Sequence, residues 1–190
     1  MNKIYLDYAA TTPTAPEVVE AMQPYFFEQF GNPSSIYSTG REAKRKLEEC
    51  REAIAKHLGA KEASEIIFTG GGSEADNLAI KGMAWARAKR GNHIITSSIE
   101  HHAVMDACKF LQDHGFEITF LPVDGDGLVD PEDVRKAIRP ETILITIMHA
   151  NNEVGTIQPI AEIGRIAKEK EIPFHTDAVQ TAGVLPIDVA

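Results

Sequence analysis

The chain of 190 residues has two cysteines and no long uninterrupted apolar run. Two cysteines in a chain of this length do not make a disulfide framework, and neither belongs to a pattern with zinc-ligand spacing. No stretch is long and apolar enough to cross a bilayer, and the opening residues lack the apolar segment of a signal peptide. We therefore expect a protein of the reducing cytoplasm that uses neither a membrane nor a metal ion.

Positive charge is also scarce. Lysine and arginine total 19 against 28 for aspartate and glutamate, which gives a formal net charge of −9. No segment rich in lysine and arginine offsets this balance, and this argues against a nucleic-acid partner. Hydrophobic residues make up 43% of the chain and charged residues 25%, which is the composition of a protein with a packed core.

Two helices are predicted in the first third of the chain. One covers Pro16–Phe30, and the second runs from about Thr39 to Leu58, where Gly59 ends it. Cys50 lies on the apolar stripe of the second helix, so we expect it to be a buried small hydrophobe. Cys108 lies on the apolar face of a later helix, and the same interpretation applies to it.

From residue 65 onward, short β-rich segments alternate with helical ones. The predicted strands are Glu65–Thr69, Asn92–Ser97, Glu117–Val123, Thr142–Met148 and Pro173–Ala178. The predicted helices are Ser73–Arg90, His101–His114, Pro131–Ile138 and Pro159–Lys170. This alternation predicts βαβ units, and therefore a three-layer αβα fold with a mainly parallel sheet. Because the last residues before Ala190 are apolar, we expect the domain to be truncated there.

The loops that follow the strands are the places to search for a ligand in such a sheet. The strand predicted at Glu65–Thr69 leads into three glycines, and Ser73 follows at the start of a helix. Glycines allow close approach of the backbone, and the helix N-terminus favours an anion, so this bend predicts a phosphate cradle. An ordinary turn with Ser73 as the N-cap explains the same residues.

Three further loops place polar side chains after strands. His101 could stack on a planar ring or move a proton, although a solvated histidine in a first helical turn is the alternative. Asn151 could donate to a ring oxygen or occupy a plain turn. Asp177 could pair with a protonated pyridine nitrogen, with Gln180 on the adjacent ring oxygen, or could cap the next turn. Together with the glycine bend, these groups suit pyridoxal 5′-phosphate.

One segment suggests a metal ion at first sight. Asp124–Asp130 has the aspartate spacing of a calcium loop, but it lacks the twelve-residue length and the terminal glutamate of an EF-hand. We therefore expect it to be a turn that leads into the helix at Pro131.

Several motifs together closely resemble the NifS/IscS-type cysteine desulfurases, which are class V members of the fold-type I pyridoxal-phosphate enzymes. The motifs are Tyr5–Pro13, Phe30–Ser35, Thr69–Asn77, Glu100–His101, Met148–Gly155 and His175–Gln180. The resemblance implies that residues 1–15 are the N-terminal segment of the small domain. It implies that residues 16–190 are the N-terminal part of the cofactor-binding large domain, with the remainder of both domains absent.

The resemblance also implies roles for individual residues. The phosphate would bind Gly72 and Ser73, the ring nitrogen would pair with Asp177, and the ring oxygen would contact Asn152 and Gln180. His101 would stack on the ring and assist proton transfer as the catalytic residue. The substrate would lie near Ala10 and Thr11.

The activity implied for the complete enzyme is conversion of L-cysteine to L-alanine, with the sulfur held as an enzyme-bound persulfide for iron–sulfur assembly or thiolation. A homodimer and a sulfur-acceptor or scaffold protein are the implied partners. The family's Schiff-base lysine and persulfide cysteine have no counterpart in these 190 residues, so we expect this chain to be inactive alone. The alternatives are a selenocysteine lyase or aminotransferase of the same class, or a non-catalytic scaffold or partner-binding fragment.

Overall fold

The computed structural model describes residues 4–190, which form two compact units. One unit comprises the chain up to Phe68 together with Pro186–Ala190, and the other comprises Thr69–Leu185. No helix among the described residues is long and apolar enough to cross a membrane.

The first unit is helical. Its elements are α1 (Pro16–Met22), α2 (Pro24–Phe27), α3 (Ser38–Leu58) and the short 3-10 helix η1 (Ala63–Glu65). The helix predicted over Pro16–Phe30 is broken before Pro24, because proline has no backbone N–H to continue the hydrogen-bond ladder. The prediction of α3 is confirmed: Gly59 ends it with φ 75°, in the left-handed region that favours glycine, and donates its N–H to the Ala55 carbonyl.

Two predictions fail in this part of the chain. The expected strand at Glu65–Thr69 does not form, because Glu65 closes η1 and the residues after it pair with no described strand. A strand without a neighbour has no ladder to stabilise it, and Ile67 is 67% exposed. The expectation that Cys50 is buried is also wrong: it is exposed, because α3 leaves its apolar stripe partly open at Leu47 and Ile54.

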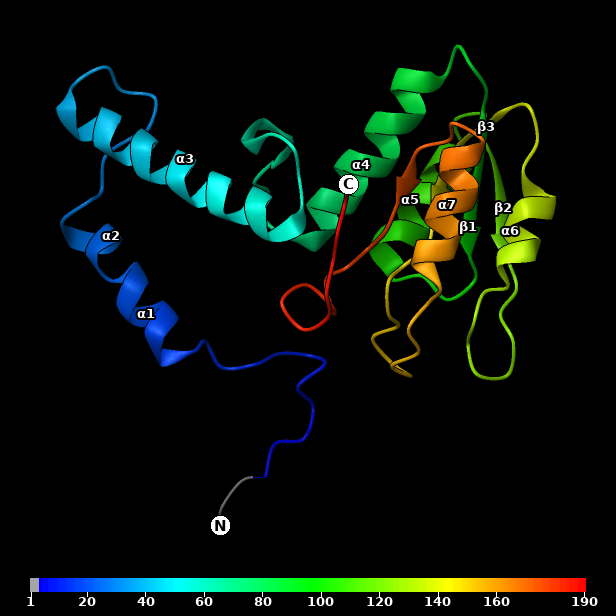
Figure 1. Ribbon diagram of the computed structural model, residues 1–190, viewed down its shortest axis with the longest axis horizontal. Helices are drawn as coiled ribbons and strands as arrows, with labels where there is room; N and C mark the ends of the chain where they lie inside the picture. Colours follow the sequence, from blue (N-terminus) through cyan, green and yellow to red (C-terminus); the bar gives the residue numbers. More distant parts are fainter. Residues whose placement is uncertain (1–3) are drawn as a thin grey trace. The chain divides into compact units, whose positions relative to one another are not determined.

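The second unit contains a parallel sheet. Among the described residues it has four strands, β1 (His93–Ser97), β2 (Glu117–Leu121), β3 (Thr142–Thr146) and β4 (Phe174–His175), in the order β2-β1-β3-β4 (Figure 1). In the register of the sheet, Ile94 of β1 lies beside Ile118 of β2 and Leu144 of β3. The expected mainly parallel α/β fold is confirmed.

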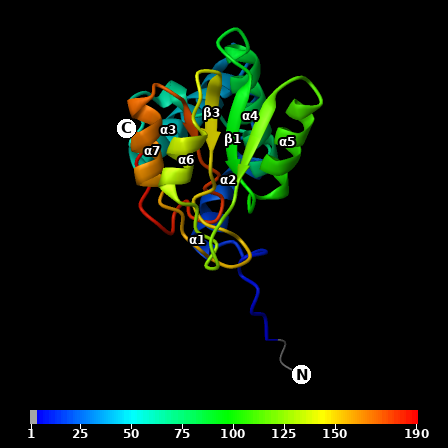
Figure 2. The same cartoon turned by 90° about the vertical axis from the view of Figure 1, so that its right-hand side faces the viewer.

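Helices cover both faces of this sheet (Figure 2). One face packs against α4 (Gly72–Arg87) and α5 (His102–Gln112), and the other against α6 (Pro131–Ala137) and α7 (Ile160–Glu169). Successive side chains of a strand point to opposite faces, so Ile94 joins the α4–α5 core and Ile95 joins the α6–α7 core. Cys108 lies fully buried on α5, as predicted. The result is three layers.

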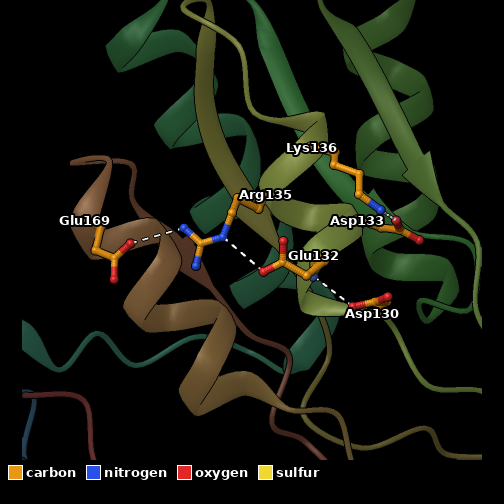
Figure 3. Close-up of polar contacts among 6 residues, drawn as sticks. All are labelled: Asp130, Glu132, Asp133, Arg135, Lys136 and Glu169. Atoms are coloured by element: carbon orange, nitrogen blue, oxygen red, sulfur yellow. Dashed lines mark hydrogen bonds and ion pairs between the residues drawn. The ribbon is translucent and has the colours of Figure 1, made fainter.

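An exposed ion pair connects the two helices of the α6–α7 layer (Figure 3). Arg135 of α6 reaches Glu132 on its own helix at 3.2 Å and Glu169 of α7 at 3.3 Å. The Asp130 carboxylate accepts the Glu132 N–H at 2.8 Å and so caps α6. Exposed ion pairs contribute little to the free energy of unfolding, so we assign these contacts a role in aligning the two helices.

The loop before α6 is the segment with calcium-like spacing. The Asp124 carboxylate accepts the backbone N–H groups of Asp126 and Leu128 at 2.9 and 2.8 Å, so it holds a turn. Over residues 4–190, no group of three or more His, Cys, Asp or Glu side chains is arranged to hold a metal ion.

Candidate ligand site at the carboxyl edge of the sheet

Parallel strands bring their carboxyl ends to one edge of the sheet, and hydrogen bonds join the loops that follow them. The Asn151 side-chain amide, after β3, donates to the Ile99 carbonyl, after β1, at 2.9 Å. The His149 N–H donates to the Asp177 carbonyl, after β4, at 2.8 Å. The loops after β1, β3 and β4 therefore form one connected edge.

The glycine bend joins this edge at the start of α4. A Cβ atom added to Gly72 would lie 2.9 Å from a methyl carbon of Val179, which is closer than real Cβ contacts allow. A side chain at position 72 would therefore require Val179 to shift, and glycine lets the start of α4 lie against the segment after Asp177 without that shift. The N-cap of α4 is Gly71, and Ser73 lies exposed in the first turn, so the alternative of Ser73 as N-cap is wrong. The Gly70 N–H donates to the Glu74 carboxylate at 2.6 Å.

His101 is the N-cap of α5. Its Nδ1 accepts the Ala103 N–H at 3.2 Å, which assigns the proton of the neutral ring to Nε2. The ring is exposed, at the carboxyl side of β1 where the sequence predicted it. A histidine held in this way presents one N–H outward from the edge.

The other predicted site residues lie in the loops after β3 and β4. Asp177 is partly buried, and its Oδ1 accepts the Val179 N–H at 2.9 Å, so it also caps a turn. Gln180 is partly buried three residues further on. The amide of Asn152 donates to the neighbouring Glu153 carboxylate at 2.9 Å. The structure thus places these residues on one edge, and their roles toward a ligand stay predictions.

Ala10 and Thr11 belong to the helical unit and are exposed. The Thr11 carbonyl accepts the Tyr5 hydroxyl at 3.3 Å. Their expected place near a substrate stays a prediction.

Asp76 is a buried acid that the sequence analysis did not select. It lies on α4, is 4% exposed, and shares the core-facing stripe with Ile80 and Ala84. The pKa of Asp76 is raised to about 6, mainly by burial and also by the charge of Asp177, with His101 acting in the opposite direction. The sequence did contain a signal: Asp76 lies four residues before Ile80 and eight before Ala84, a spacing that puts an acid on the same helical face as two apolar residues.

His175 of β4 completes the surroundings of Asp76. Its Nε2 lies 3.6 Å from Asp76 Oδ1, and its Nδ1 is 2.8 Å from the Thr146 hydroxyl. Burial lowers the pKa of His175, while the charge of Asp177 raises it. The ring is therefore a neutral hydrogen-bonding group between β3 and α4 near pH 7.

Glu100 is a second buried acid that the sequence analysis quoted without giving it a role. Its Oε1 accepts the Ser97 hydroxyl at 2.6 Å and the Met148 N–H at 3.0 Å, so it fastens the loop after β1 to the loop after β3. The pKa of Glu100 is raised to about 7, mainly by burial and also by the charges of Asp177 and Asp76, against the opposing effect of those hydrogen bonds. Three carboxyl groups thus act on one another at this edge.

The edge therefore has two chemically different ends. The glycine bend and the start of α4 favour an anion. The acids around Asp177 favour a cation, because Asp76 Oδ2 and Glu100 Oε2 are buried without a hydrogen-bond partner among the described residues. A ligand with a phosphate at one end and a protonated ring nitrogen at the other fits both.

The fold is that of an α/β protein with a parallel sheet, the class in which ligands bind at the carboxyl ends of the strands. The family model for aminotransferase class-V matches residues 4–190, and the chain belongs to that family. Class V aminotransferases and cysteine desulfurases are pyridoxal-phosphate enzymes.

The similar proteins are cysteine desulfurases. The chain is 62% identical over 188 residues to the cysteine desulfurase IscS of Dictyoglomus turgidum, covering 99% of this chain and 48% of that protein. It is 57% identical over 189 residues to the putative cysteine desulfurase IscS 1 of Bacillus subtilis, covering 100% of this chain and 50% of that protein.

Solved structures of similar proteins share the fold of this chain. SspA in complex with cysteine is 50% identical with a TM-score of 0.93, over 97% of this chain and 53% of that chain. A NifS-like protein is 42% identical with a TM-score of 0.94, over 99% of this chain and 52% of that one. The resemblance to NifS/IscS-type cysteine desulfurases is confirmed, and the chain spans about half the length of the curated relatives it matches.

Proposed function

We propose that this chain forms the N-terminal part of a pyridoxal-phosphate-dependent cysteine desulfurase. The complete enzyme converts L-cysteine to L-alanine and keeps the sulfur as an enzyme-bound persulfide. Support comes from relatives named cysteine desulfurase at 57 to 62% identity over nearly the whole chain. A similar structure was solved in complex with cysteine, which is the chemistry proposed for the substrate.

The chain's own residues would bind and orient the cofactor. The phosphate binds Gly72 and Ser73, where the glycine bend lets backbone N–H groups approach an anion. Asp177 keeps the ring nitrogen protonated, and Asn152 and Gln180 contact the ring oxygen. His101 would stack on the ring and assist proton transfer. The bound cofactor supplies an electron sink, which lowers the cost of removing a proton from the amino-acid substrate.

The observation that carries this proposal is the close approach of Gly72 to Val179. It sets the anion-favouring bend beside the turn that Asp177 caps. Both ends of a phosphorylated pyridine are thereby matched by groups on one edge of one compact unit.

Partners and domain boundaries are further parts of the proposal. The enzyme is a cytoplasmic homodimer that passes its sulfur to an acceptor or scaffold protein for iron–sulfur assembly or thiolation. Residues 1–15 belong to the small domain, with Ala10 and Thr11 near the substrate, and residues 16–190 begin the large domain. The 190 residues alone are inactive, because they hold no counterpart of the family's Schiff-base lysine or persulfide cysteine.

The test is binding of 4′-deoxypyridoxine 5′-phosphate to the 190-residue chain, measured by titration calorimetry. This analogue lacks the aldehyde and cannot react with surface lysines. We expect Asp177→Asn to weaken binding about tenfold or more, as removal of one partner of a charge pair does. The control is Asp106→Asn, an exposed aspartate on α5 whose side chain is 70% accessible. Absence of binding, or equal binding by the Asp177→Asn variant, would refute the proposal and favour a non-catalytic fragment.

A further inference from the structure

Asp76 is a buried acid to which the proposed function gives no task. A carboxyl group on the core-facing stripe of α4, 4% exposed and with Oδ2 unpartnered among the described residues, is costly. Ile80 and Ala84, on the same stripe, show what packing alone requires there. The presence of an acid at this position therefore calls for a compensating electrostatic interaction.

The groups around Asp76 do not supply that compensation. Asp177 and Glu100 are acids whose charges are coupled to it. His175, at 3.6 Å, is a neutral ring near pH 7, since burial lowers its pKa. Three carboxyl groups therefore repel one another at the edge, and a cation placed beside Asp177 relieves the repulsion.

We propose that Asp76 is a positioning residue that acts through Asp177 and His175 to favour ligand rings carrying a positive charge beside Asp177. This inference rests on the proposed function, because it takes Asp177 as the contact of the ring nitrogen. Asp76 does not touch the ring. Its carboxylate adds negative potential behind Asp177, and its contact with His175 fixes the ring that spans from Thr146 to α4.

The contribution of the Asp76 charge to the preference for a positively charged ring should change with pH in a defined direction. Asp76 carries its charge above a pKa of about 6, so its contribution is present at pH 7.5 and lost by pH 5. A second unit charge in a partly buried site changes the affinity for a cation about tenfold. Lower pH also protonates pyridine more completely, which alone would increase the preference for pyridine. The two effects therefore have opposite signs.

The experiment compares two phosphate esters on the 190-residue chain by titration calorimetry. One is 4′-deoxypyridoxine 5′-phosphate, and the other is benzyl phosphate, whose ring has no nitrogen. The quantity measured is the ratio of the two dissociation constants, in which the phosphate contribution cancels. The variants are Asp76→Asn, Asp177→Asn and the exposed control Asp106→Asn, each checked for folding by circular dichroism.

We expect Asp76→Asn to lower the preference for the pyridine ester about tenfold at pH 7.5, with benzyl phosphate affinity unchanged within about twofold. The difference between wild type and Asp76→Asn closes at pH 5, whereas a merely structural role would leave it constant. Protonation of the free pyridine ester is common to both proteins, so it cancels when the preferences of wild type and Asp76→Asn are compared at each pH.

The outcomes separate the two proposals. If Asp177→Asn loses the preference and Asp76→Asn keeps it, the role of Asp76 is refuted and the proposed function stands. If wild type shows no preference for the pyridine ester, or binds neither ester, the proposed function itself fails. A difference in preference between wild type and Asp76→Asn that stays constant from pH 7.5 to pH 5 also refutes the role of Asp76.

Discussion

Replacement of Glu100 by glutamine should change how the stability of the sheet unit depends on pH. Glutamine keeps an oxygen that can accept from the Ser97 hydroxyl and the Met148 N–H, but it cannot ionise. In the folded chain the pKa of Glu100 is raised from 4.5 to about 7, mainly by burial. The folded state therefore retains a proton that the unfolded state has lost between these two values, and stability falls as pH rises through that window.

The size of the effect follows from the pKa shift. At about 1.4 kcal/mol per pKa unit, the shift corresponds to about 3 kcal/mol of unfolding free energy. Glu100→Gln should therefore gain about 3 kcal/mol relative to wild type between pH 4.5 and pH 8, whatever its stability at pH 4.5. The comparison between the two proteins cancels other titrating groups that they share.

Urea unfolding at several pH values measures this difference. Trp85 is the chain's single tryptophan and packs against Phe116 with ring centroids 5.2 Å apart, so its fluorescence reports on the sheet unit. Glu153→Gln, at an exposed position in the loop after β3, is the control and should give a constant difference from wild type. A difference between wild type and Glu100→Gln that stays within about 0.5 kcal/mol from pH 4.5 to pH 8 would refute the assignment of Glu100 as a desolvated acid.

Three further outcomes are expected. Burial lowers the pKa of His93 from 6.5 to about 4, so wild type should lose about 3 kcal/mol of unfolding free energy relative to His93→Gln as pH falls through that window. A thiol reagent should modify the exposed Cys50 in the native chain, and Cys108, whose pKa burial raises to about 12, only after unfolding. Gly72→Ala should lower the unfolding free energy by about 1–2 kcal/mol, and adding Val179→Ala should restore it.

The sequence predicted the sheet unit well because each of its strands and helices has a strong local pattern. The apolar runs that became β1 and β3 pack on both faces, and Pro131 fixed the start of α6. The strand expected at Glu65–Thr69 has an equally good local pattern, but a strand also needs a neighbour to pair with. Local residues carry no information about that neighbour.

Because local residues carry no information about distant neighbours, the sequence predicted some residues of the candidate site and missed others. The glycine bend, His101 and Asp177 follow elements whose ends are visible in the sequence. Asp76 and Glu100 are distinguished by burial and by the charges facing them, which come from segments distant in the sequence. The prediction that Cys50 is buried was wrong because an apolar stripe on a helix becomes a buried face only where another element covers it.

The strand order has a consequence for synthesis on the ribosome. Each strand, as it emerges, can join the outside of a ladder that already exists: β2 on one side of β1, β3 on the other, and β4 on β3. None of these four strands has to be inserted between two that are already paired, so this part of the sheet can grow by addition. Until β4 arrives, β3 is an open edge with unpaired backbone groups, and a chain stalled at that stage exposes this edge to pairing with other chains.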